Sequence, residues 1–544
     1  MKKICFLLLF FPLAAIAQDK PDVQEKIATF TQVWGFLKYY HPAVAKGTQD
    51  WDSVFMQRIK KVYTLNSKEA QDNFYAEWII SLGPVEECKR CNTKPEVTYN
   101  LDNAWLKDEK IFSMGVSKQL QWIEQNRNQD KNYYVSAFPG VGNTNYANEK
   151  PYADSVFPSA EMRLLGLARF WNAAQYFFPY KYVIGRDWKE VLYEMIPAFQ
   201  HPADTVAYHL AMKQLVASLN DSHAQLNTPY ISKWYGYKWV PFSFKLIDNK
   251  AVATSFYNDT LCRANDIRIG DAFVSVNGKP VAAIIKEQWK YVGASNDAVK
   301  LRGMGWAIFN GNTDSVKVTF ERDGVLQEKT IGRYLYPSFH YVYKNGGPDS
   351  FRIINDNIGY INLGWLMPDN VDMVMKELKN TKALILDVRN YPNSTFRQLS
   401  KYLNDGWKEF AKFTTPNLDH PGAYTFTKPI TTGGRSNNYY KGKVILLFNE
   451  SSQSHAEFTI MALQTAPHVV SIGSQTSGAD GNVSYIVLPG NYKTLFTGIG
   501  VFYPDGKETQ RVGIVPDIVV KPTIAGIRAG RDEVLERSIE EANR

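Results

Sequence analysis

The chain has 544 residues, of which 44% are hydrophobic and 21% are charged, as in ordinary globular proteins. At about 100–200 residues per domain, this length predicts three or four domains. The formal net charge is +8 and falls to +6 without Lys2 and Lys3, and no basic run is present, so the sequence argues against a nucleic-acid partner.

The first segment, residues 1–17, has the pattern of a secretory signal peptide. Two lysines precede an apolar core at residues 5–16, which is too short to span a bilayer, and Ala15-Ile16-Ala17 is a small-x-small cleavage site. An uncleaved anchor is the alternative. No later stretch is long and apolar enough for a transmembrane helix, so we expect a soluble protein that is periplasmic or secreted.

A repeated motif predicts two helical units, an N-terminal domain at residues 18–160 and a second unit at residues 161–235. Four residues recur after 137 positions: Trp34, Tyr39, Pro42 and Trp51 return as Trp171, Tyr176, Pro179 and Trp188. Each copy has the pattern of an amphipathic helix that ends before proline, followed by a loop and a second helix. We favour duplicated helix packing over a substrate-guiding surface. His41 corresponds to Phe178, which argues against a shared catalytic role for the motif.

The segment Cys88-Lys-Arg-Cys91 can be half of a zinc site, a redox pair or a local disulfide. A structural zinc ion needs four ligands, and the sequence has no second cysteine pair and no thioredoxin-like pattern around this one. A local disulfide is the expected state in an oxidising compartment. The remaining Cys262 is expected to be a buried thiol.

The second helical unit ends in a candidate general base. Residues 208–219 have a helical pattern, and Asn220 can end that helix in a left-handed conformation. His223 follows on an irregular loop that we expect to be exposed, and Ser222 is placed to hydrogen-bond nearby and fix its orientation. The alternative is a surface histidine without a catalytic role.

From residue 236 to residue 340 the pattern changes to short alternating strands, at 239–246, 251–256 and 315–322. A further strand leads into Asn277-Gly278, which is a strong hairpin signal. This segment, from Gly270-Asp271 to the Asn-Gly turn, resembles a PDZ domain, a module that binds peptide ends by strand addition. The alternative is a small β-barrel that joins two domains.

Residues 341–544 alternate buried strands with helices. Strand patterns occupy 358–363, 383–388, 443–448 and 469–473, with helices such as 371–378 and 456–465 between them. This order predicts an α/β domain with a largely parallel sheet.

Ser454 is the candidate nucleophile of this domain. It follows a buried strand and begins a helix, whose unpaired N–H groups and positive end would stabilise an oxyanion. The competing interpretation is a helix cap, because Ser454-x-x-Glu457 is a capping box. His455 is a weaker candidate base, since adjacent helical side chains do not face each other. No lysine that could act as the base lies between Lys443 and Lys493.

Taken in order, these motifs resemble the C-terminal processing (tail-specific) serine peptidase family, especially its tricorn-like branch, over most of the chain after the leader. The motifs are Asp221-Ser222-His223, the PDZ-like insert, Asp387-Val-Arg389-Asn390, Asn449…Ser454-x-x-Glu457, Gly473…Thr476-x-Gly478 and Gly513-Ile-Val-Pro516-Asp517. The resemblance implies a multidomain α/β protein: a crotonase-like or Clp-protease-like catalytic domain, a PDZ-like β domain and N-terminal helical repeat units.

The resemblance also implies roles for single residues. Ser454 matches the nucleophile of the family. The lysine base of the better-known branch and its accompanying glutamine fall at Ala479 and Val483, so the usual Ser-Lys dyad is absent. The tricorn-like branch instead uses an upstream histidine with an orienting serine, and these match His223 and Ser222.

The relay and the oxyanion hole depart from the family pattern. The distant glutamate of the tricorn-like branch falls at Gln510, with Glu508 close by. The family commonly has a glycine-rich turn after Asp-x-Arg, but this chain has a turn that contains Pro392, which has no N–H to donate. The backbone N–H groups of His455 and Tyr391 are the remaining candidate oxyanion donors.

The sequence therefore predicts an exported serine-type peptidase, either an endopeptidase or a C-terminal processing enzyme. The expected substrates are peptides or unfolded proteins, and no cofactor or metal is implied. One alternative is a non-catalytic peptide-binding protein on a degenerate peptidase scaffold. Another is acyl transfer or esterase activity on a non-peptide substrate, because the same constellation serves any acyl group.

Overall fold

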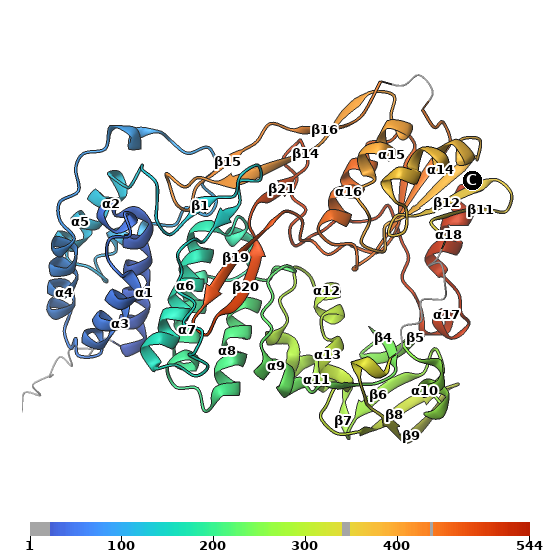
Figure 1. Cartoon of the computed structure of the whole chain (residues 1–544), viewed down its shortest axis with the longest axis horizontal. Coiled ribbons are helices and arrows are strands. Elements are labelled where there is room, and N and C mark those ends of the chain that lie inside the picture. Colours follow the sequence, from blue (N-terminus) through green and yellow to red (C-terminus); the bar gives the residue numbers. More distant parts are fainter. Residues whose placement is uncertain (1–21, 340–348, 436–438) are drawn as a thin grey trace, which may run out of the picture.

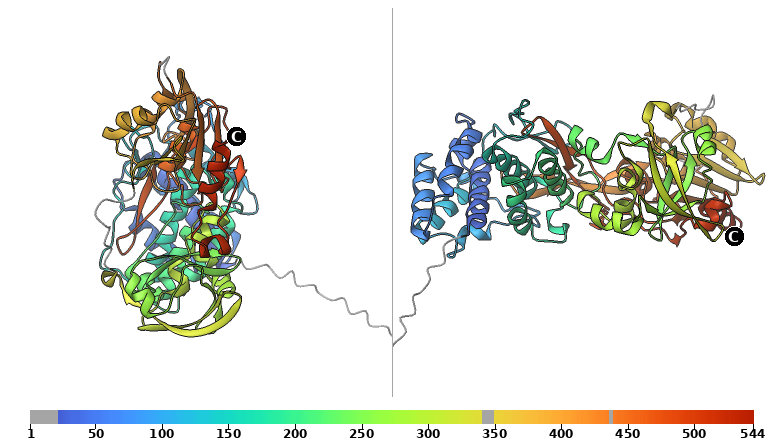
Figure 2. Two further views of the ribbon diagram at one scale, coloured as in Figure 1. Left: turned by 90° about the vertical axis from the view of Figure 1, so that its right-hand side faces the viewer. Right: turned by 90° about the horizontal axis from the view of Figure 1, so that it is seen from below.

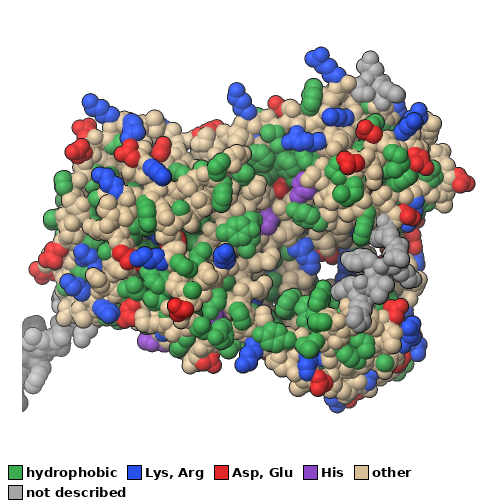
Figure 3. All heavy atoms as spheres, in the orientation of Figure 1, with side chains coloured by type: hydrophobic (Ala, Val, Ile, Leu, Met, Phe, Trp, Pro, Cys, Tyr) green, Lys and Arg blue, Asp and Glu red, His purple; other side chains and the backbone are tan. Residues whose placement is uncertain are grey.

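The computed structural model describes residues 22–339, 349–435 and 439–544, so the predicted signal peptide lies outside the described residues. Figure 1 shows a helical body at one end and, at the other, a small β domain beside an α/β domain. Figure 2 shows the same elongated arrangement from two further sides, and Figure 3 shows positive and negative side chains intermixed on one face. Within the described ranges, no helix combines the length and apolar character needed to cross a bilayer.

The helical body begins with α1 (Val23–Tyr40) and ends with α9 (Pro229–Tyr235). Between them lie α2 (Pro42–Ala45), α3 (Trp51–Val62), α4 (Lys68–Ser81), α5 (Met114–Gln125), α6 (Ala160–Phe177), α7 (Trp188–Gln200) and α8 (Thr205–Ala217). The connections contain 3-10 turns at Lys89–Asn92, Ala104–Lys107 and Lys181–Val183 and the short strands β1 (Ser136–Ala137) and β2 (Thr144–Asn145). Asp50, Ser67 and Ser159 each accept a backbone hydrogen bond at the start of a helix, which explains where these helices begin.

The two copies of the repeat use their tryptophans in the same way. Trp34 Nε1 donates to Trp51 O at 3.0 Å, and Trp51 Nε1 donates back to Trp34 O at 3.1 Å. Trp171 and Trp188 exchange the same pair of hydrogen bonds, at 2.7 and 3.0 Å. All four indoles are buried in one hydrophobic core that both copies share. These tryptophans therefore serve helix packing and do not form a substrate-guiding surface.

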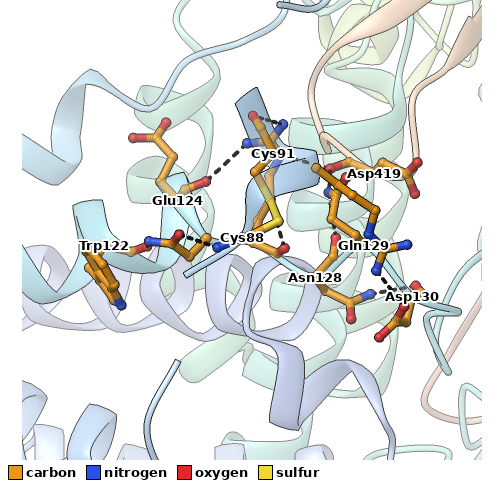
Figure 4. The surroundings of a disulfide bond; sticks show 11 residues. Cys88, Cys91, Trp122, Glu124, Asn128, Gln129, Asp130 and Asp419 are labelled. Carbon is orange, nitrogen blue, oxygen red and sulfur yellow. Dashed lines mark hydrogen bonds and ion pairs between the residues drawn. A yellow bond between two sulfur atoms is a disulfide. The ribbon is translucent and has the colours of Figure 1, made fainter. Parts of the chain in front are cut away.

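Cys88 and Cys91 form a local disulfide, and Cys262 is a buried free thiol. Figure 4 shows the surroundings of the disulfide, which include Gln129 and Asp419. Gln129 Nε2 donates to Asp419 O at 2.7 Å. The disulfide thus closes a tight loop near a point where the helical body is tied to a loop of the C-terminal part.

The small β domain, residues 236–339, is built on an antiparallel sheet of order β4-β5-β6-β8-β9. Its strands are β3 (Lys238–Trp239), β4 (Phe242–Ile247), β5 (Lys250–Phe256), β6 (Ala272–Val276), β7 (Lys279–Pro280), β8 (Ser315–Arg322), β9 (Val325–Gly332) and β10 (Tyr334–Leu335). Its helices are α10 (Asp259–Ala264), α11 (Val281–Gln288), α12 (Asp297–Arg302) and α13 (Gly305–Phe309), with 3-10 turns at Trp289–Tyr291 and Tyr336–Ser338.

The predicted Asn-Gly hairpin is confirmed, because Asn277 and Gly278 have φ of 49° and 76° between β6 and β7. The predicted strand at 239–246 is divided instead of continuous. Pro241, which has no N–H to contribute to a ladder, separates β3 from β4. The PDZ-like interpretation of this domain stays a prediction.

The α/β domain is built on a sheet of order β11-β12-β13-β17-β18-β22, in which β11 is antiparallel and the other strands are parallel. The strands are β11 (Phe351–Ile354), β12 (Ile358–Asn362), β13 (Ala383–Asp387), β17 (Lys443–Phe448), β18 (Val469–Gly473) and β22 (Ile518–Val519). The helices are α14 (Val371–Leu378), α15 (Phe396–Leu403), α16 (His455–Leu463), α17 (Ile524–Arg528) and α18 (Glu533–Ala542), with a 3-10 turn at Pro368–Asn370. Helices α14, α15 and α16 cover one face of the sheet and α18 covers the other. The predicted parallel sheet is confirmed, and its crotonase-like form stays a prediction.

Strands of the α/β domain also reach the helical body. β14 (Trp407–Pro416) pairs with β15 (Tyr424–Phe426), β16 (Ile430–Gly433) and β21 (Gly500–Phe502). The hairpin of β19 (Val483–Leu488) and β20 (Tyr492–Thr497) buries Ile486, Leu488 and Phe496 in the core of the helical body, and Figure 1 shows it beside α6 and α8. This crossing brings the end of β20 to the loop that follows α8, where Thr497 N–H donates to Asp221 Oδ2 at 2.7 Å.

Candidate active site

Ser454 lies on a strained turn between a strand and a helix. β17 ends at Phe448, a short loop follows, and Ser454 precedes α16 with φ 57° and ψ −121°. An ordinary N-cap residue has an extended backbone with negative φ, so this conformation is strained for a residue that carries a Cβ atom. A strand, a strained serine and then a helix is the arrangement that presents the nucleophile in many serine hydrolases.

The capping interpretation is also correct, since Ser454 and Glu457 form a capping box. Ser454 N–H donates to Glu457 Oε2 at 3.2 Å and to Ala479 O at 3.0 Å. The same carboxyl accepts from Thr476 Oγ1 at 2.6 Å and from the N–H groups of Gly478 and Ala479 at 2.8 and 3.0 Å. Burial raises the pKa of Glu457, although these hydrogen bonds lower it. Glu457 therefore holds the loop that contains Ala479 against the start of α16.

A cavity of about 410 Å³ opens beside Ser454. It is lined by Tyr391, Phe413, Ser454, His455, Phe458, Asp480, Gly481, Asn482 and Val483. The backbone N–H groups of His455 and Tyr391, the two predicted oxyanion donors, have no acceptor among the described residues. Each is therefore available to an oxygen atom of a ligand. The His455 Nε2 atom is buried without a partner in the described part of the chain, and burial lowers the pKa of this ring.

Asp480 is a residue of this cavity that the sequence analysis did not single out. Its side chain is only 3% exposed, and Oδ1 accepts from Gly481 N–H at 2.7 Å. Oδ2 has no hydrogen-bond partner among the residues that the structure describes. Burial, followed by the charge of Glu457, raises the pKa of Asp480 well above its ordinary value. Its position directly after Ala479, where the family's lysine would stand, was the available sequence signal.

The loop that carries His223 begins as predicted but is buried. Asn220 has φ of 50°, which is the left-handed helix end expected from the sequence. The expectation of an exposed loop is wrong, because His223 is only 8% exposed. The end of β20 and the segment around Ser295 cover it, through contacts that a sequence pattern does not reveal.

The imidazole of His223 is held by a chain of two further side chains. His223 Nδ1 lies 2.8 Å from Thr497 Oγ1, and this hydroxyl donates to Asp221 Oδ1 at 2.9 Å. A hydroxyl has one proton, so Thr497 accepts from Nδ1–H and leaves Nε2 as the basic nitrogen. Burial lowers the pKa of His223, against the charge of Asp221. Thr497 and Asp221 are therefore site residues whose roles the sequence analysis missed.

Ser222 has partners other than the imidazole. Its hydroxyl donates to Ser477 O at 3.1 Å and accepts from Ser295 N–H at 2.9 Å. This corrects the expectation that Ser222 orients His223 directly, because Thr497 makes the contact to the ring. Ser222 instead anchors the loop that carries His223 to the 477 segment.

Of the two predicted relay residues, one reaches this network. Gln510 is buried and its Nε2 donates to Asp221 Oδ1 at 3.4 Å, a long hydrogen bond. Glu508 accepts a hydrogen bond from Tyr182 and makes no contact with His223 among the described residues. The structure thus joins Gln510, and not Glu508, to the carboxylate behind His223.

The loops of Ser454 and His223 meet, although 231 positions separate the two residues in sequence. Gln453 Nε2 donates to Ser222 O at 3.2 Å, so the residues directly before Ser454 and His223 are hydrogen-bonded. Within the described ranges, no hydrogen bond joins the Ser454 hydroxyl to the His223 ring. The structure therefore brings the two loops together through Gln453 and Ser222, without a hydrogen bond between Ser454 and His223 among the described residues.

Comparisons with known proteins bear on the family and on the fold. Residues 357–520 match the model of Peptidase family S41, and no curated protein sequence matches the chain. A solved structure of mature CPAF complexed with lactacystin has a TM-score of 0.54 at 15% identity, covering 70% of this chain and 98% of that one. A second structure of mature CPAF has a TM-score of 0.53 at 14% identity, covering 70% and 96%. The tricorn protease, at 15% identity over 71% of this chain and 37% of that one, has a TM-score of only 0.32.

At these identities the likeness to mature CPAF shows a shared fold. The family match is local, and all nine residues that line the cavity beside Ser454 lie within it, whereas His223 lies outside. Residues 357–520 are thus similar to Peptidase family S41, and the chain is a serine-type peptidase.

Proposed function

We propose that the protein is an exported endopeptidase or C-terminal processing peptidase in which Ser454 is the nucleophile. The observation that carries the proposal is the positive φ of Ser454 at the start of α16, beside a cavity of about 410 Å³. Such a backbone costs about 1–3 kcal/mol and persists where the surrounding structure enforces it. Helix capping alone does not require it, since ordinary caps are extended.

In this mechanism the Ser454 hydroxyl attacks the carbonyl carbon of the scissile peptide bond. The oxyanion that forms accepts hydrogen bonds from the N–H groups of His455 and Tyr391, and the positive end of α16 stabilises its charge. His223 Nε2 takes the serine proton and returns it to the leaving amine. Water then hydrolyses the acyl-enzyme with the same base.

The imidazole of His223 is held for this role by hydrogen bonds on its Nδ1 side. Thr497 fixes the proton on Nδ1 of His223, and Asp221 stabilises the positive charge that the ring acquires. Catalytic hydrogen bonds are often long or unmade in enzymes without substrate and tighten when substrate binds. The hydrogen bond from Gln453 to Ser222 holds the two loops together, which supports such an adjustment.

Two further features support the location and the substrate class. The disulfide between Cys88 and Cys91 suits an oxidising compartment, and with the leader pattern at residues 1–17 it favours the periplasm or the cell exterior. Among the described strands, β4 has β5 as its one neighbour in the sheet. The other edge of β4 can accept an extended peptide by strand addition, as in PDZ domains. We therefore infer peptide or unfolded protein substrates.

The test is cleavage of an unfolded protein by the purified mature chain, compared with Ser454→Ala and with Ser451→Ala. Ser451 is exposed on the same loop and serves as the matched control. We expect fragments from the wild type and from Ser451→Ala, and none from Ser454→Ala. If wild type and Ser454→Ala cleave equally, the assignment of Ser454 fails. If none cleaves and a serine-directed phosphonate labels none, a peptide-binding protein without catalysis becomes the better interpretation.

A further inference from the structure

The cavity beside Ser454 contains a buried carboxyl that nothing in the proposed mechanism uses. Asp480 lines this cavity and is 3% exposed, yet its Oδ2 has no hydrogen-bond partner in the described part of the chain. A buried polar atom left without a partner costs about 1–3 kcal/mol. Because Asp480 lines the cavity, a ligand that binds there can supply the missing partner.

The remaining walls of the cavity are apolar or uncharged. Phe413 and Phe458 are stacked with ring centroids 5.9 Å apart. The other lining residues besides Asp480 are Tyr391, Ser454, His455, Gly481, Asn482 and Val483. Among the described residues that line the cavity there is no lysine or arginine, and burial, followed by the charge of Glu457, raises the pKa of Asp480. The cavity thus combines aromatic walls with a buried carboxyl that has no cationic partner in the described part of the chain.

The position of the cavity determines which part of a substrate can enter it. Ser454 and the two candidate oxyanion donors, His455 and Tyr391, line the same space. A substrate carbonyl held between them places the side chain of its own residue in this cavity. That residue is the one on the acyl side of the bond that is cleaved.

We propose that this cavity is the specificity subsite of the peptidase and that it takes a cationic side chain, lysine or arginine, whose charge pairs with Asp480. The inference rests on the proposed function, because it assumes that Ser454 attacks the carbonyl of the residue bound here.

Other side chains fit the cavity less well. An apolar side chain packs against Phe413 and Phe458 but leaves Asp480 Oδ2 without a partner. An acidic side chain would place a second carboxyl beside that of Asp480, and two carboxylates at close range repel each other. A lysine or arginine side chain pairs with Asp480 through its head group, and its cation can also lie over the aromatic rings.

The test uses quenched peptides that differ only at the acyl-side residue, which is lysine, norleucine or glutamate. Norleucine has the aliphatic chain of lysine without the ammonium group. We expect the wild type to show kcat/KM at least about tenfold higher for lysine than for norleucine, and lowest for glutamate. In Asp480→Asn this lysine-to-norleucine ratio should fall at least about tenfold, and Asp480→Glu should restore part of it. The exposed Asp405 provides the control variant Asp405→Asn, which should keep the wild-type ratio.

The ratio corrects for any general loss of activity in the Asp480 variants. If a variant is too poorly folded for peptide assays, the rates at which lysine-like and norleucine-like phosphonates label Ser454 give the same ratio. A wild type that prefers norleucine, or an Asp480→Asn variant with an unchanged ratio, overturns the proposal. A wild type that neither cleaves any peptide nor is labelled by either phosphonate overturns the proposed function itself.

Discussion

The loops that carry Ser454 and His223, the proposed nucleophile and base, lie in opposite environments. Ser454 is half-buried on a strained backbone and lines a cavity. Among the described residues, the backbone N–H and one ring nitrogen of its neighbour His455 have no partner. His223 is buried, and its ring is bonded through Thr497 to Asp221. The loop of Ser454 thus has polar groups without hydrogen-bond partners in the described part of the chain, whereas the polar groups around His223 are hydrogen-bonded to one another.

This difference indicates that the two loops have different roles. Unpaired and strained groups are retained near Ser454, where a substrate would complete them. The paired network near His223 fixes a tautomer and a ring orientation, which a base needs before substrate arrives. Substitutions near Ser454 should therefore abolish catalysis or change substrate preference. Substitutions of Thr497 or Asp221 should change the orientation of the His223 ring and so lower the rate less.

The largest expected effect belongs to the nucleophile. Ser454→Ala removes the attacking oxygen, and we expect kcat/KM to fall about 10⁴-fold or more. Thermal unfolding should show a folded variant, because the carboxylate of Glu457 can still accept from the backbone N–H at position 454. Peptide cleavage measures the loss, and an effect smaller than about tenfold would place the nucleophile elsewhere.

The next effect is on the base. His223→Asn removes the proton acceptor, and we expect kcat/KM to fall about 10³-fold with KM little changed. His201→Asn alters an exposed histidine and serves as the control in the same assay. Equal activities of these two variants would mean that another group deprotonates Ser454.

A smaller effect is expected for Thr497, the hydrogen-bond partner of the His223 ring. Thr497→Val keeps the size of the side chain but leaves Nδ1–H of His223 without an acceptor, so kcat should fall about 10–100-fold through misplacement of the ring. Thr497→Ser restores the hydroxyl and should recover most of the rate. Failure of serine to rescue the rate would show that packing, and not the hydrogen bond, explains the loss.

The two relay candidates should differ from each other. Gln510→Ala removes a long hydrogen bond to Asp221, and a loss of about 1 kcal/mol corresponds to about fivefold in kcat/KM. Glu508→Ala should stay within about twofold, because its carboxylate accepts from Tyr182 and not from the network. The reverse order in kinetic measurements would contradict the positions described here.

The pH profile provides the finest test of the base environment. The active form of His223 is the neutral imidazole, and its pKa is lowered by burial. The acidic limb of log kcat/KM against pH should therefore have its midpoint below about 6.5, the ordinary histidine value, with activity lost as pH falls through it. A midpoint above that value would indicate that Asp221 outweighs burial and that the ring is charged more easily than the structure implies.

The sequence predicted the parts of this site that depend on local pattern. Alternating hydrophobicity located β12, β13, β17 and β18, and the strand–loop–helix order placed Ser454 at the start of α16. The turn residues Asn220 and Asn277 behave as their types predict, each with positive φ. These features depend on a few neighbouring residues, so a single sequence is enough to find them.

The parts that the sequence analysis missed depend on distant partners. Thr497 contacts His223 across 274 positions, and it does so because the hairpin of β19 and β20 leaves the α/β domain and packs on the helical body. The same crossing helps to bury the loop that was expected to be exposed. Ser222 has its partners in two other distant segments, at Ser477 and Ser295. The sequence placed Asp480 directly after Ala479, but its burial is a property of the tertiary structure.

The most direct test of the paired roles of Ser454 and His223 is the site and rate of labelling by a serine-directed phosphonate. Mass spectrometry of the digested wild type should find one adduct, on the peptide that contains Ser454, and tandem fragmentation should place it on that residue. In His223→Asn the adduct should form at the same residue but at least about 100-fold more slowly. An adduct on Ser451 or Ser452, or equal labelling rates with and without the imidazole, would contradict the account.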